Sequence, residues 1–514
     1  MVQPMTTDAP PWASAAASTP YAGIRETHTG VVVLIGDRAY KIKKPITTDF
    51  LDYSSVASRE RACAREVELN RRLAPDSYLG IAHLTDPSAG PAEPVIVMRR
   101  HPDSRRLATM VRNGEAVGGC LARIAEILTA FHDRADRGGT IDAEGTVRAV
   151  DARWRANITG LSRFVGTVIT AETVRDIDRL ATQFLAGCAA LFTSRIEDRR
   201  IVDGHGDLLA DDIFCLPGGV EILDCLEFDD RLRYVDTIDD AAFLAMDLEF
   251  LGANDLANFF LDHYIRLSGD RAPASLKDFY IAYRAVVRAK VDCIRVRQGR
   301  TDAALDASRH LEIALAHLRT GAVRLVLVGG GPGTGKTTVA HRLAERVGAH
   351  VISTDAVRRE LHDSQAISGT PGALDRGLYS AANVAAVYDA VLRRAQLLLA
   401  AGQSVILDGT WRDPLQRAKA RDVAAATHTA MSEILCVAPG ATAAERVANR
   451  GSDAVSDATP AVAHALETDA AQWSGACVVD TTCPIAETVR DAEAMWRCMV
   501  RSIDSFSRIP KEEE

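Results

Sequence analysis

The chain has 514 residues, more than one hydrophobic core usually serves, so two or more domains are expected. Its composition, 47% hydrophobic and 25% charged, is that of an ordinary globular protein. The net charge of −9 argues against broad nucleic-acid binding, and no apolar run reaches the roughly 18 residues of a membrane span.

Residues 1–20 are rich in Pro, Ala, Ser and Thr and have no basic start before a long apolar core. This composition predicts a disordered tail and argues against a signal peptide. Ten cysteines are scattered along the chain without a CxxC pair, which favours reduced, mostly buried thiols over a disulfide framework or a zinc site. These features together predict a cytoplasmic protein.

Two strand-like runs, at residues 30–37 and 38–45, open the folded part, and Gly36 and Asp37 between them suit a tight hairpin turn. A helical pattern follows at residues 58–74, then a further strand at residues 94–100. Mostly helical sequence comes after it. A small sheet followed by helices predicts a small α+β lobe that leads into a larger helical lobe.

A helical pattern at residues 302–319 ends just before an apolar run, and we place a domain boundary near residue 320. Short apolar runs then alternate with helical patterns, which predicts βαβ units and a parallel sheet. The runs are residues 325–328, 351–353, 405–407, 434–437 and 478–479. The expected domains are a tail at 1–20, an α+β domain at 21–320 and an α/β domain at 321–514.

Residues typical of phosphoryl transfer occur in order along the α+β domain. In "AYKIKKP", strand alternation puts Lys41 and Lys43 on one face. A lysine in this place holds nucleotide phosphates when a glutamate on the next helix orients it, and Glu66 lies beside the packed face of that helix. The loop "HGDLLADDI" supplies Asp207, expected to be the catalytic base for a substrate hydroxyl. His205 is expected to hold this loop.

Two further carboxylates suit a metal ion. Asp212 lies five residues after Asp207, and Asp224 follows an apolar run. Mg²⁺ prefers oxygen ligands, so both are expected to bind it. With Asp211, the four aspartates would crowd one site, which disfavours full ionisation without metal. We therefore expect a working site that depends steeply on Mg²⁺.

Residues 21–320 resemble the aminoglycoside phosphotransferase family, which shares the protein-kinase-like fold. The resemblance rests on "AYKIKKP", "REVELNRRL", "VIVMRR", "LTAFHDR", "HGDLLADDI" and "ILDCLEF". It implies a phosphate lysine (Lys41), its partner (Glu66), a catalytic base (Asp207) and a metal ligand (Asp224). Where the family carries Asn, this chain carries Asp212, which keeps an oxygen ligand and removes a hydrogen-bond donor.

The α/β domain opens with "GGPGTGKT" at residues 330–337, which fits GxxxxGK[ST] between a strand and a helix. The glycines let backbone N–H groups surround phosphate oxygens, and the helix N-terminus adds a favourable dipole. Lys336 is expected to reach the terminal phosphates of ATP and Thr337 to bind Mg²⁺. The residues expected to bind the nucleotide are Gly330, Gly331, Pro332, Gly333, Thr334, Gly335, Lys336, Thr337 and Thr338.

Four other positions of this domain suit catalysis or metal binding. Asp355 follows the second strand and is expected to activate an acceptor hydroxyl; a helix N-cap formed by Thr354 or Asp355 is the alternative. Asp408 ends a strand and is expected to bind Mg²⁺ or its water. Arg446 and Arg450 lie four residues apart, and Arg450 is expected to neutralise charge on the transferring phosphate. Surface salt bridges are the alternative for both arginines.

Residues 323–514 resemble small P-loop kinases of the zeta-toxin, gluconate-kinase and polynucleotide-kinase type, through "GGPGTGKTT", "STDAVRREL" and "ILDGTW". The tandem order resembles bacterial proteins described as bifunctional aminoglycoside phosphotransferase/ATP-binding proteins. We predict an ATP-dependent phosphotransferase with two nucleotide sites that act on small-molecule hydroxyls. The alternatives are one kinase half gated by an ATP-binding regulatory half, and a stress-linked protein or nucleotide kinase.

The acceptor is expected to be a sugar, an amino sugar or a similar small alcohol. Acidic stretches such as "VDTIDDAAF" at residues 235–243 permit a polycationic aminoglycoside. Two alternatives are that these aspartates anchor the catalytic loop structurally and that they form a solvated face, as acidic helices usually do.

Overall fold

The computed structural model describes residues 21–26, 29–47, 52–85, 90–370, 376–449 and 473–500. Contacts divide the chain into two compact units. Unit 1 comprises Met1–Val150, Arg195–Ala272 and Tyr280–Ala314, and unit 2 comprises Asp151–Ser194, Pro273–Phe279 and Leu315–Glu514. The boundary expected near residue 320 stays a prediction.

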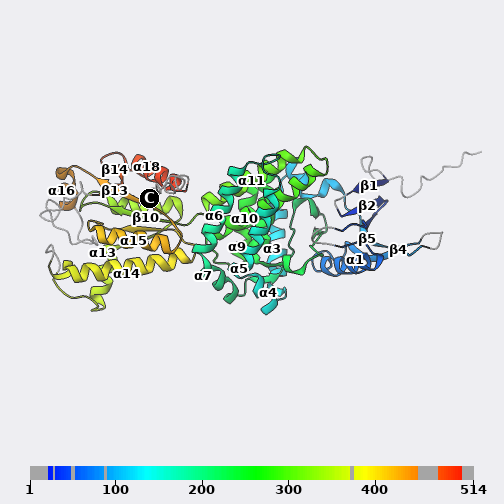
Figure 1. Cartoon of the computed structure of the whole chain (residues 1–514), viewed down its shortest axis with the longest axis horizontal. Helices are drawn as coiled ribbons and strands as arrows, with labels where there is room; N and C mark the ends of the chain where they lie inside the picture. Colours follow the sequence, from blue (N-terminus) through cyan, green and yellow to red (C-terminus); the bar gives the residue numbers. More distant parts are fainter. Residues whose placement is uncertain are drawn as a thin grey trace, which may run out of the picture. The chain divides into compact units, whose positions relative to one another are not determined.

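Unit 1 begins with a five-stranded antiparallel sheet in the order β1-β2-β3-β5-β4. Its strands are β1 (Ala22–Glu26), β2 (Gly30–Ile35), β3 (Arg38–Lys43), β4 (Tyr78–Leu84) and β5 (Glu93–Arg99). Helix α1 (Val56–Asn70) packs on β4 and β5 (Figure 1). It starts where the side chain of Ser55 accepts the backbone N–H of Ser58 at 3.1 Å.

The predicted hairpin is confirmed, because Ile35 pairs with Arg38 across a two-residue turn. Gly36 occupies this turn with a φ of +56°, a conformation that few residues other than glycine adopt easily. The sequence analysis missed β1 and β4. Strand β1 is almost fully exposed and shows no alternation of apolar and polar residues, and the register of β4 shifts at Gly80.

The rest of unit 1 is mostly helical, with two small two-stranded sheets, β6-β9 and β7-β8. The helices are α2 (Leu107–Arg112), α3 (Gly118–Arg134), α4 (Gly139–Glu144), α8 (Thr237–Phe250), α9 (Asn254–Ser268), and the parts within unit 1 of α10 (Ala274–Arg297) and α11 (Ala303–Thr320). The strands are β6 (Ile201–Asp203), β7 (Ile213–Leu216), β8 (Gly219–Ile222) and β9 (Tyr234–Asp236). The unit therefore has the predicted α+β architecture, a small sheet followed by a mostly helical part.

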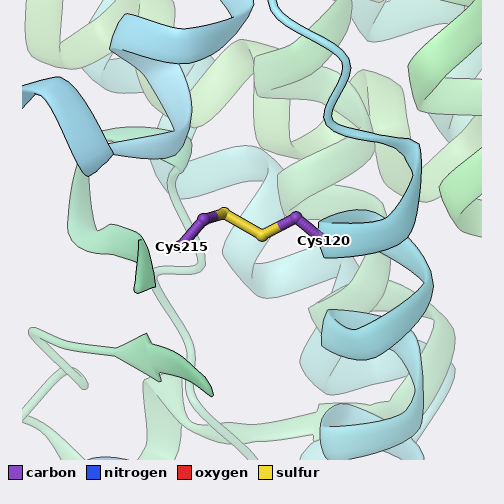
Figure 2. Close-up of a disulfide and its surroundings, with 2 residues drawn as sticks. All are labelled: Cys120 and Cys215. Carbon is purple, nitrogen blue, oxygen red and sulfur yellow. A yellow bond between two sulfur atoms is a disulfide. The ribbon is translucent and has the colours of Figure 1, made fainter. Parts of the chain in front are cut away.

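A disulfide joins Cys120, in the first turn of α3, to Cys215 in β7 (Figure 2). The expectation of reduced thiols throughout is wrong for this pair. The two residues are 95 positions apart in sequence, and only the tertiary fold brings their Cα atoms within 6.2 Å. The other eight cysteines, within the described residues, have free thiols.

Removing this disulfide is expected to destabilise unit 1. Closing a loop of this length lowers the entropy of the unfolded chain, and the chain-entropy relation gives about 4–5 kcal/mol as the largest effect. Urea unfolding with and without a thiol reductant measures the effect. A variant with both Cys120→Ser and Cys215→Ser is the control and should ignore the reductant. Ten titratable thiols in the denatured, unreduced wild type would contradict the disulfide.

Unit 2 contains a five-stranded sheet in the order β11-β12-β10-β13-β14, with every neighbouring pair parallel. Its strands are β10 (Arg324–Gly329), β11 (His350–Ser353), β12 (Val405–Asp408), β13 (Ala430–Val437) and β14 (Cys477–Asp480). All five predicted apolar runs fall on these strands, so the predicted α/β fold with a parallel sheet is confirmed. The central strand β10 is buried along its whole length, as a strand covered on both faces must be.

Helices α12 and α18 pack on each other, and α14 packs on α13 and α15. In Figure 1, α14 and α18 lie on opposite sides of the labelled strands. The helices of unit 2 are α5 (Val147–Ser162), α6 (Ala171–Gly187), α7 (Ala189–Glu197), α12 (Lys336–Val347), α13 (Thr354–Asp363), α14 (Ala381–Ala400), α15 (Pro414–Ala426), α16 (Gly440–Ala448) and α18 (Ile485–Cys498), where α5 and α7 extend a few residues into unit 1. No helix in the described ranges is long and apolar enough to cross a bilayer.

Candidate active sites

The loop after β6 carries Asp207, and carboxylates at the start of α8 hold its backbone. Asp240 accepts the N–H groups of His205 at 2.7 Å and Gly206 at 2.9 Å. Arg284 of α10 donates to Asp239 at 2.6 and 2.9 Å and to the carbonyl of Gly206 at 3.0 Å. Asp239 and Asp240 of "VDTIDDAAF" therefore anchor the loop, and the alternative of a solvated acidic face is wrong for both, because they are buried.

Glycine is required at the close approach between this loop and α8. A Cβ at Gly204 would lie 2.5 Å from a carboxylate oxygen of Asp240. Gly206 has a φ of +84°, and a Cβ there would lie 3.2 Å from the backbone oxygen of Leu232. Gly204 thus lets the backbone approach the carboxylate of Asp240, and Gly206 lets it pass close to the backbone of Leu232.

His205 connects the loop that carries Asp207 to the segment that ends in Asp224. Its Nδ1 accepts the N–H of Asp207 at 3.3 Å, so its Nε2 carries the proton and donates to the carbonyl of Leu223 at 3.1 Å. Burial lowers the pKa of His205, which favours this neutral form. These contacts agree with the structural role expected from the sequence.

Lys41 forms the expected ion pair with Glu66. Its Nζ lies 2.8 Å from one oxygen of Glu66 and 2.5 Å from an oxygen of Asp224. Glu66 lies in α1 and its side chain is fully buried, so the position of its carboxylate is fixed. Asp224 has a φ of +64°, an unfavourable conformation for a residue with a side chain, and it therefore stores some backbone strain at the site.

A second lysine, Lys43, occupies the same face of β3, and the sequence analysis gave it no role. Its Nζ lies 2.6 Å from the other oxygen of Glu66 and also pairs with Glu227. Glu227 accepts the hydroxyl of Tyr53 at 2.9 Å. The alternation of the strand had placed Lys43 on the same face as Lys41, and a role for Lys43 could have been predicted from this. No feature of the local sequence identified Glu227 as its partner. The pair fixes the segment after Asp224 to the sheet.

The surroundings of the acidic residues shift their pKa values in different directions. Burial and the nearby carboxylate of Asp224 raise the pKa of Asp207 to about 6, although Arg288 and Arg284 oppose the shift. Burial, Asp224 and Asp207 raise the pKa of Asp212 well above the ordinary value. Burial also acts on Asp224, but its ion pair with Lys41 outweighs this effect and lowers its pKa.

Asp211 does not join this cluster, which corrects the expected crowding of four aspartates. Its half-exposed carboxylate points towards Arg112, with a separation of 3.6 Å. The three-residue turn that contains it (Ala210–Asp212) sends consecutive side chains in different directions.

The unit 1 carboxylates suit Mg²⁺ in chemistry and in charge. Asp212 and Asp224 supply the oxygen ligands that this ion prefers, and their mutual repulsion calls for a nearby cation. Among the described residues, however, no group of three or more His, Cys, Asp or Glu side chains is arranged to hold a metal. Phosphate oxygens of a nucleotide would have to complete the coordination, as is usual for Mg²⁺.

In unit 2, the loop between β10 and α12 has the shape that phosphate binding requires. Gly330, Gly333 and Gly335 have φ values of +140°, +82° and +80°. A Cβ at Gly333 would lie 2.2 Å from the carbonyl oxygen of Ala443, so only glycine fits there. Lys336 begins α12, and its buried side chain reaches back to the carbonyl of Gly331 at 3.5 Å.

Thr337 and Asp408 meet at the expected place. The hydroxyl of Thr337 donates to one oxygen of Asp408 at 2.9 Å, and the other oxygen of Asp408 is buried without a hydrogen-bond partner. Burial raises the pKa of Asp408, and Asp355 adds to the shift while Lys336 opposes it. An unpartnered buried carboxylate oxygen beside a hydroxyl fits a Mg²⁺ site.

Asp355 pairs with Arg358 one turn along α13. The N-cap alternative is wrong for Asp355, because Ser353 is the N-cap residue and no side chain caps this helix. Arg358 also lies over the ring of Tyr379, 4.5 Å from its centroid. Lys336 and Asp355 both act on the pKa of Asp408, so both side chains lie near this carboxylate.

Arg446 binds the phosphate loop, and the surface-salt-bridge alternative is wrong for it. Its guanidinium donates to the hydroxyl and the carbonyl of Thr481 at 3.0 and 2.8 Å. The hydroxyl of Thr481 lies 2.8 Å from the carbonyl oxygen of Thr334. The sequence analysis missed Thr481. Arg450 lies outside the described residues, so its expected role stays a prediction.

The curated proteins similar to this chain include uncharacterized protein Rv2004c of Mycobacterium tuberculosis (strain ATCC 25618 / H37Rv). The two are 56% identical over 481 residues, which span 94% of this chain and 96% of the relative. The chain belongs to the same family as this mycobacterial protein. The family model of the AAA domain (AAA_33) matches residues 325–475, a segment that begins in β10.

Solved structures are similar to parts of the chain. A gluconokinase from Sinorhizobium meliloti 1021 is 19% identical, covers 37% of the chain and 99% of its own, and has a TM-score of 0.28. The GDP and kanamycin complex of APH(2")-IIia is 15% identical, covers 59% of the chain and 95% of its own, and has a TM-score of 0.39. The segment that the AAA-domain model matches includes the glycine loop of unit 2, with Lys336 and Thr337.

Proposed function

We propose that the chain is an ATP-dependent phosphotransferase with two nucleotide sites, one in each unit. Each site transfers the γ-phosphate of ATP to a hydroxyl of a small molecule. The observation that supports a working site in unit 1 is the pairing of Lys41 with both Glu66 and Asp224. A phosphate lysine, its orienting glutamate and a metal-ligand carboxylate are thereby assembled within direct contact.

In unit 1, Asp207 has the role of catalytic base. Its carboxylate takes the proton of the acceptor hydroxyl while the oxygen of that hydroxyl forms a bond to the γ-phosphorus, and the bond from that phosphorus to ADP breaks. The pKa of Asp207, raised to about 6 mainly by burial, makes it a better proton acceptor than an ordinary aspartate. The anchoring of its loop by Asp240 and Arg284 fixes its position.

In unit 2, the glycine loop and Lys336 bind the phosphates, and Asp355 takes the proton of the acceptor. Arg358 holds the carboxylate of Asp355 in place. Mg²⁺, held by Asp212 and Asp224 in unit 1 and by Thr337 and Asp408 in unit 2, would neutralise charge on the phosphates. The phosphate loop, held to Thr481 and Arg446, is pre-organised for this purpose.

Replacing Asp212 by Asn is expected to raise the half-saturating Mg²⁺ concentration of unit 1 several-fold, up to about tenfold. Asn keeps an oxygen ligand but removes a negative charge, and ligand charge sets Mg²⁺ affinity. ATP turnover against Mg²⁺ is measured in full-length protein that also carries Lys336→Ala, which silences unit 2. Asp211→Asn is the matched control. No turnover at any Mg²⁺ concentration in either form would contradict a working site in unit 1.

A screen tests the proposed function as a whole. The full-length protein is incubated with ATP, Mg²⁺ and a pool of small metabolites, and products are identified by mass spectrometry. We expect newly phosphorylated small molecules. Phosphorylated protein without such products would favour a protein kinase, and ADP without any phosphorylated acceptor would contradict the proposal.

A further inference from the structure

One face of α10 lies against the catalytic loop of unit 1, which carries Asp207. Arg284, Arg288 and Asp292 are spaced four residues apart and therefore share this face. Arg284 contacts the carbonyl of Gly206, the residue directly before Asp207. Asp292, one turn beyond Arg288, accepts from His310 at 2.8 Å. Both neighbours of Arg288 on this face thus have protein partners.

Arg288 differs from them. Its side chain is half-buried, and its Nε is buried without a hydrogen-bond partner. Within the residues that the structure describes, Arg288 forms no hydrogen bond and no ion pair. A guanidinium cannot be neutralised by losing a proton, so its charge stays in place and lacks compensation by direct contact.

Three other carboxylates of this region accept hydrogen bonds from groups other than Arg288. Asp239 accepts hydrogen bonds from the guanidinium of Arg284, and Asp240 accepts hydrogen bonds from two backbone N–H groups of the catalytic loop. Asp247 accepts the N–H of Ala210 at 2.8 Å. Burial raises the pKa of Asp207 and of Asp247, and the charge of Arg288 opposes both shifts, which places the guanidinium near these two residues. The protein therefore positions a cation beside the catalytic base and leaves its fork of donors unused.

We propose that Arg288 binds an anionic group, a carboxylate or a phosphate, of the acceptor that unit 1 phosphorylates. This inference rests on the proposed function of unit 1. The planar guanidinium matches both anions through two parallel hydrogen bonds. Arg284 contacts the Asp207 loop, and Arg288 lies one helical turn further along α10. Residues one turn apart are separated by about 5–6 Å, so the distance from the loop to Arg288 suits a compact hydroxylated acid or phosphate ester. A polycationic acceptor would bring like charges against Arg288.

The test uses full-length protein carrying Lys336→Ala, so that ADP formation reports on unit 1. A small-molecule cell extract is separated by ion exchange into anionic, neutral and cationic fractions, and each fraction is assayed for stimulation of ADP formation. We expect stimulation by the anionic fraction. Treating that fraction with alkaline phosphatase distinguishes the two sources: stimulation is lost if the anion is a phosphate ester and persists if it is a carboxylate.

Arg288→Met should then raise the amount of anionic fraction needed for half-maximal stimulation by about 10- to 100-fold, the usual range for a hydrogen-bonded charge pair. Arg288→Lys keeps the positive charge and should recover part of the loss. It provides the measurement if Arg288→Met folds poorly. Arg300→Met, at an exposed arginine paired with Asp302, is the matched control and should match the parent.

Stimulation by the neutral or cationic fraction alone would overturn the inference, and so would an Arg288→Met variant that responds to the anionic fraction as the parent does. If no fraction stimulates ADP formation, the proposed function of unit 1 fails, and the inference falls with it.

Discussion

Replacing Asp207 by Asn should reduce phosphoryl transfer by unit 1 by about 10²- to 10⁴-fold, the usual contribution of a general base. Asn keeps the size and shape of the side chain, and the loop keeps its anchors on Asp240 and Arg284. The affinity for ATP should change little, because Lys41 and Glu66 remain in place. Transfer is measured as phosphorylated acceptor formed by full-length protein that carries Lys336→Ala.

The pH profile of the same site gives a second measurement of the role of Asp207. A base must be ionised to accept a proton, and the pKa of Asp207 is raised to about 6, mainly by burial. The rate of phosphoryl transfer by unit 1 should therefore be constant well above pH 6 and fall about tenfold for each pH unit below it. Asp211→Asn is the matched control, because Asp211 is half-exposed and points towards Arg112. A rate that Asp207→Asn leaves within twofold would contradict this role.

Replacing Lys336 by Ala should reduce phosphoryl transfer by unit 2 by about 10²- to 10³-fold, as expected for a donor lost from a pre-organised phosphate site. Lys336 is buried at the start of α12, and its side chain reaches back over the glycine loop. The loop contains no second lysine that could replace Lys336. The partial positive charge at the N-terminus of α12 is smaller than the full charge of a lysine. Nucleotide binding by calorimetry and product formation together measure the loss.

Lys419→Ala is the matched control for this variant. Lys419 lies on α15 and forms a partly exposed pair with Asp389, so its removal should affect stability and activity only slightly. Retention of unit 2 products by Lys336→Ala at the wild-type rate would contradict the assignment of the phosphate loop.

Local sequence was enough to predict the parts of the site that depend on backbone conformation and spacing. The phosphate loop requires glycine at Gly330 and Gly333 because neighbouring backbone leaves no room for a Cβ, and that requirement is visible as a motif. The pairing of Lys41 with Glu66 was predictable because a strand and the next helix follow each other in the chain. The parallel sheet of unit 2 followed from its apolar runs.

Contacts between distant segments were not predictable in this way. Lys43 meets Glu227 across 184 positions, and Cys120 meets Cys215 across 95. Arg284 reaches back over 78 positions to Gly206, and no periodicity or spacing marks either residue as a partner of the other. Asp211 shows the opposite failure: a motif groups it with Asp212, but a tight turn sends its side chain away from the site.

The central claim is that the chain holds two phosphotransfer sites that act separately. Mass-spectrometric comparison of the products formed by the wild type, Asp207→Asn, Lys336→Ala and the double variant tests it most directly. We predict that each single variant removes a different phosphorylated product and that the double variant removes both. Loss of the same product in both single variants, with no product that depends on one site alone, would contradict the claim and favour one catalytic site controlled by the other.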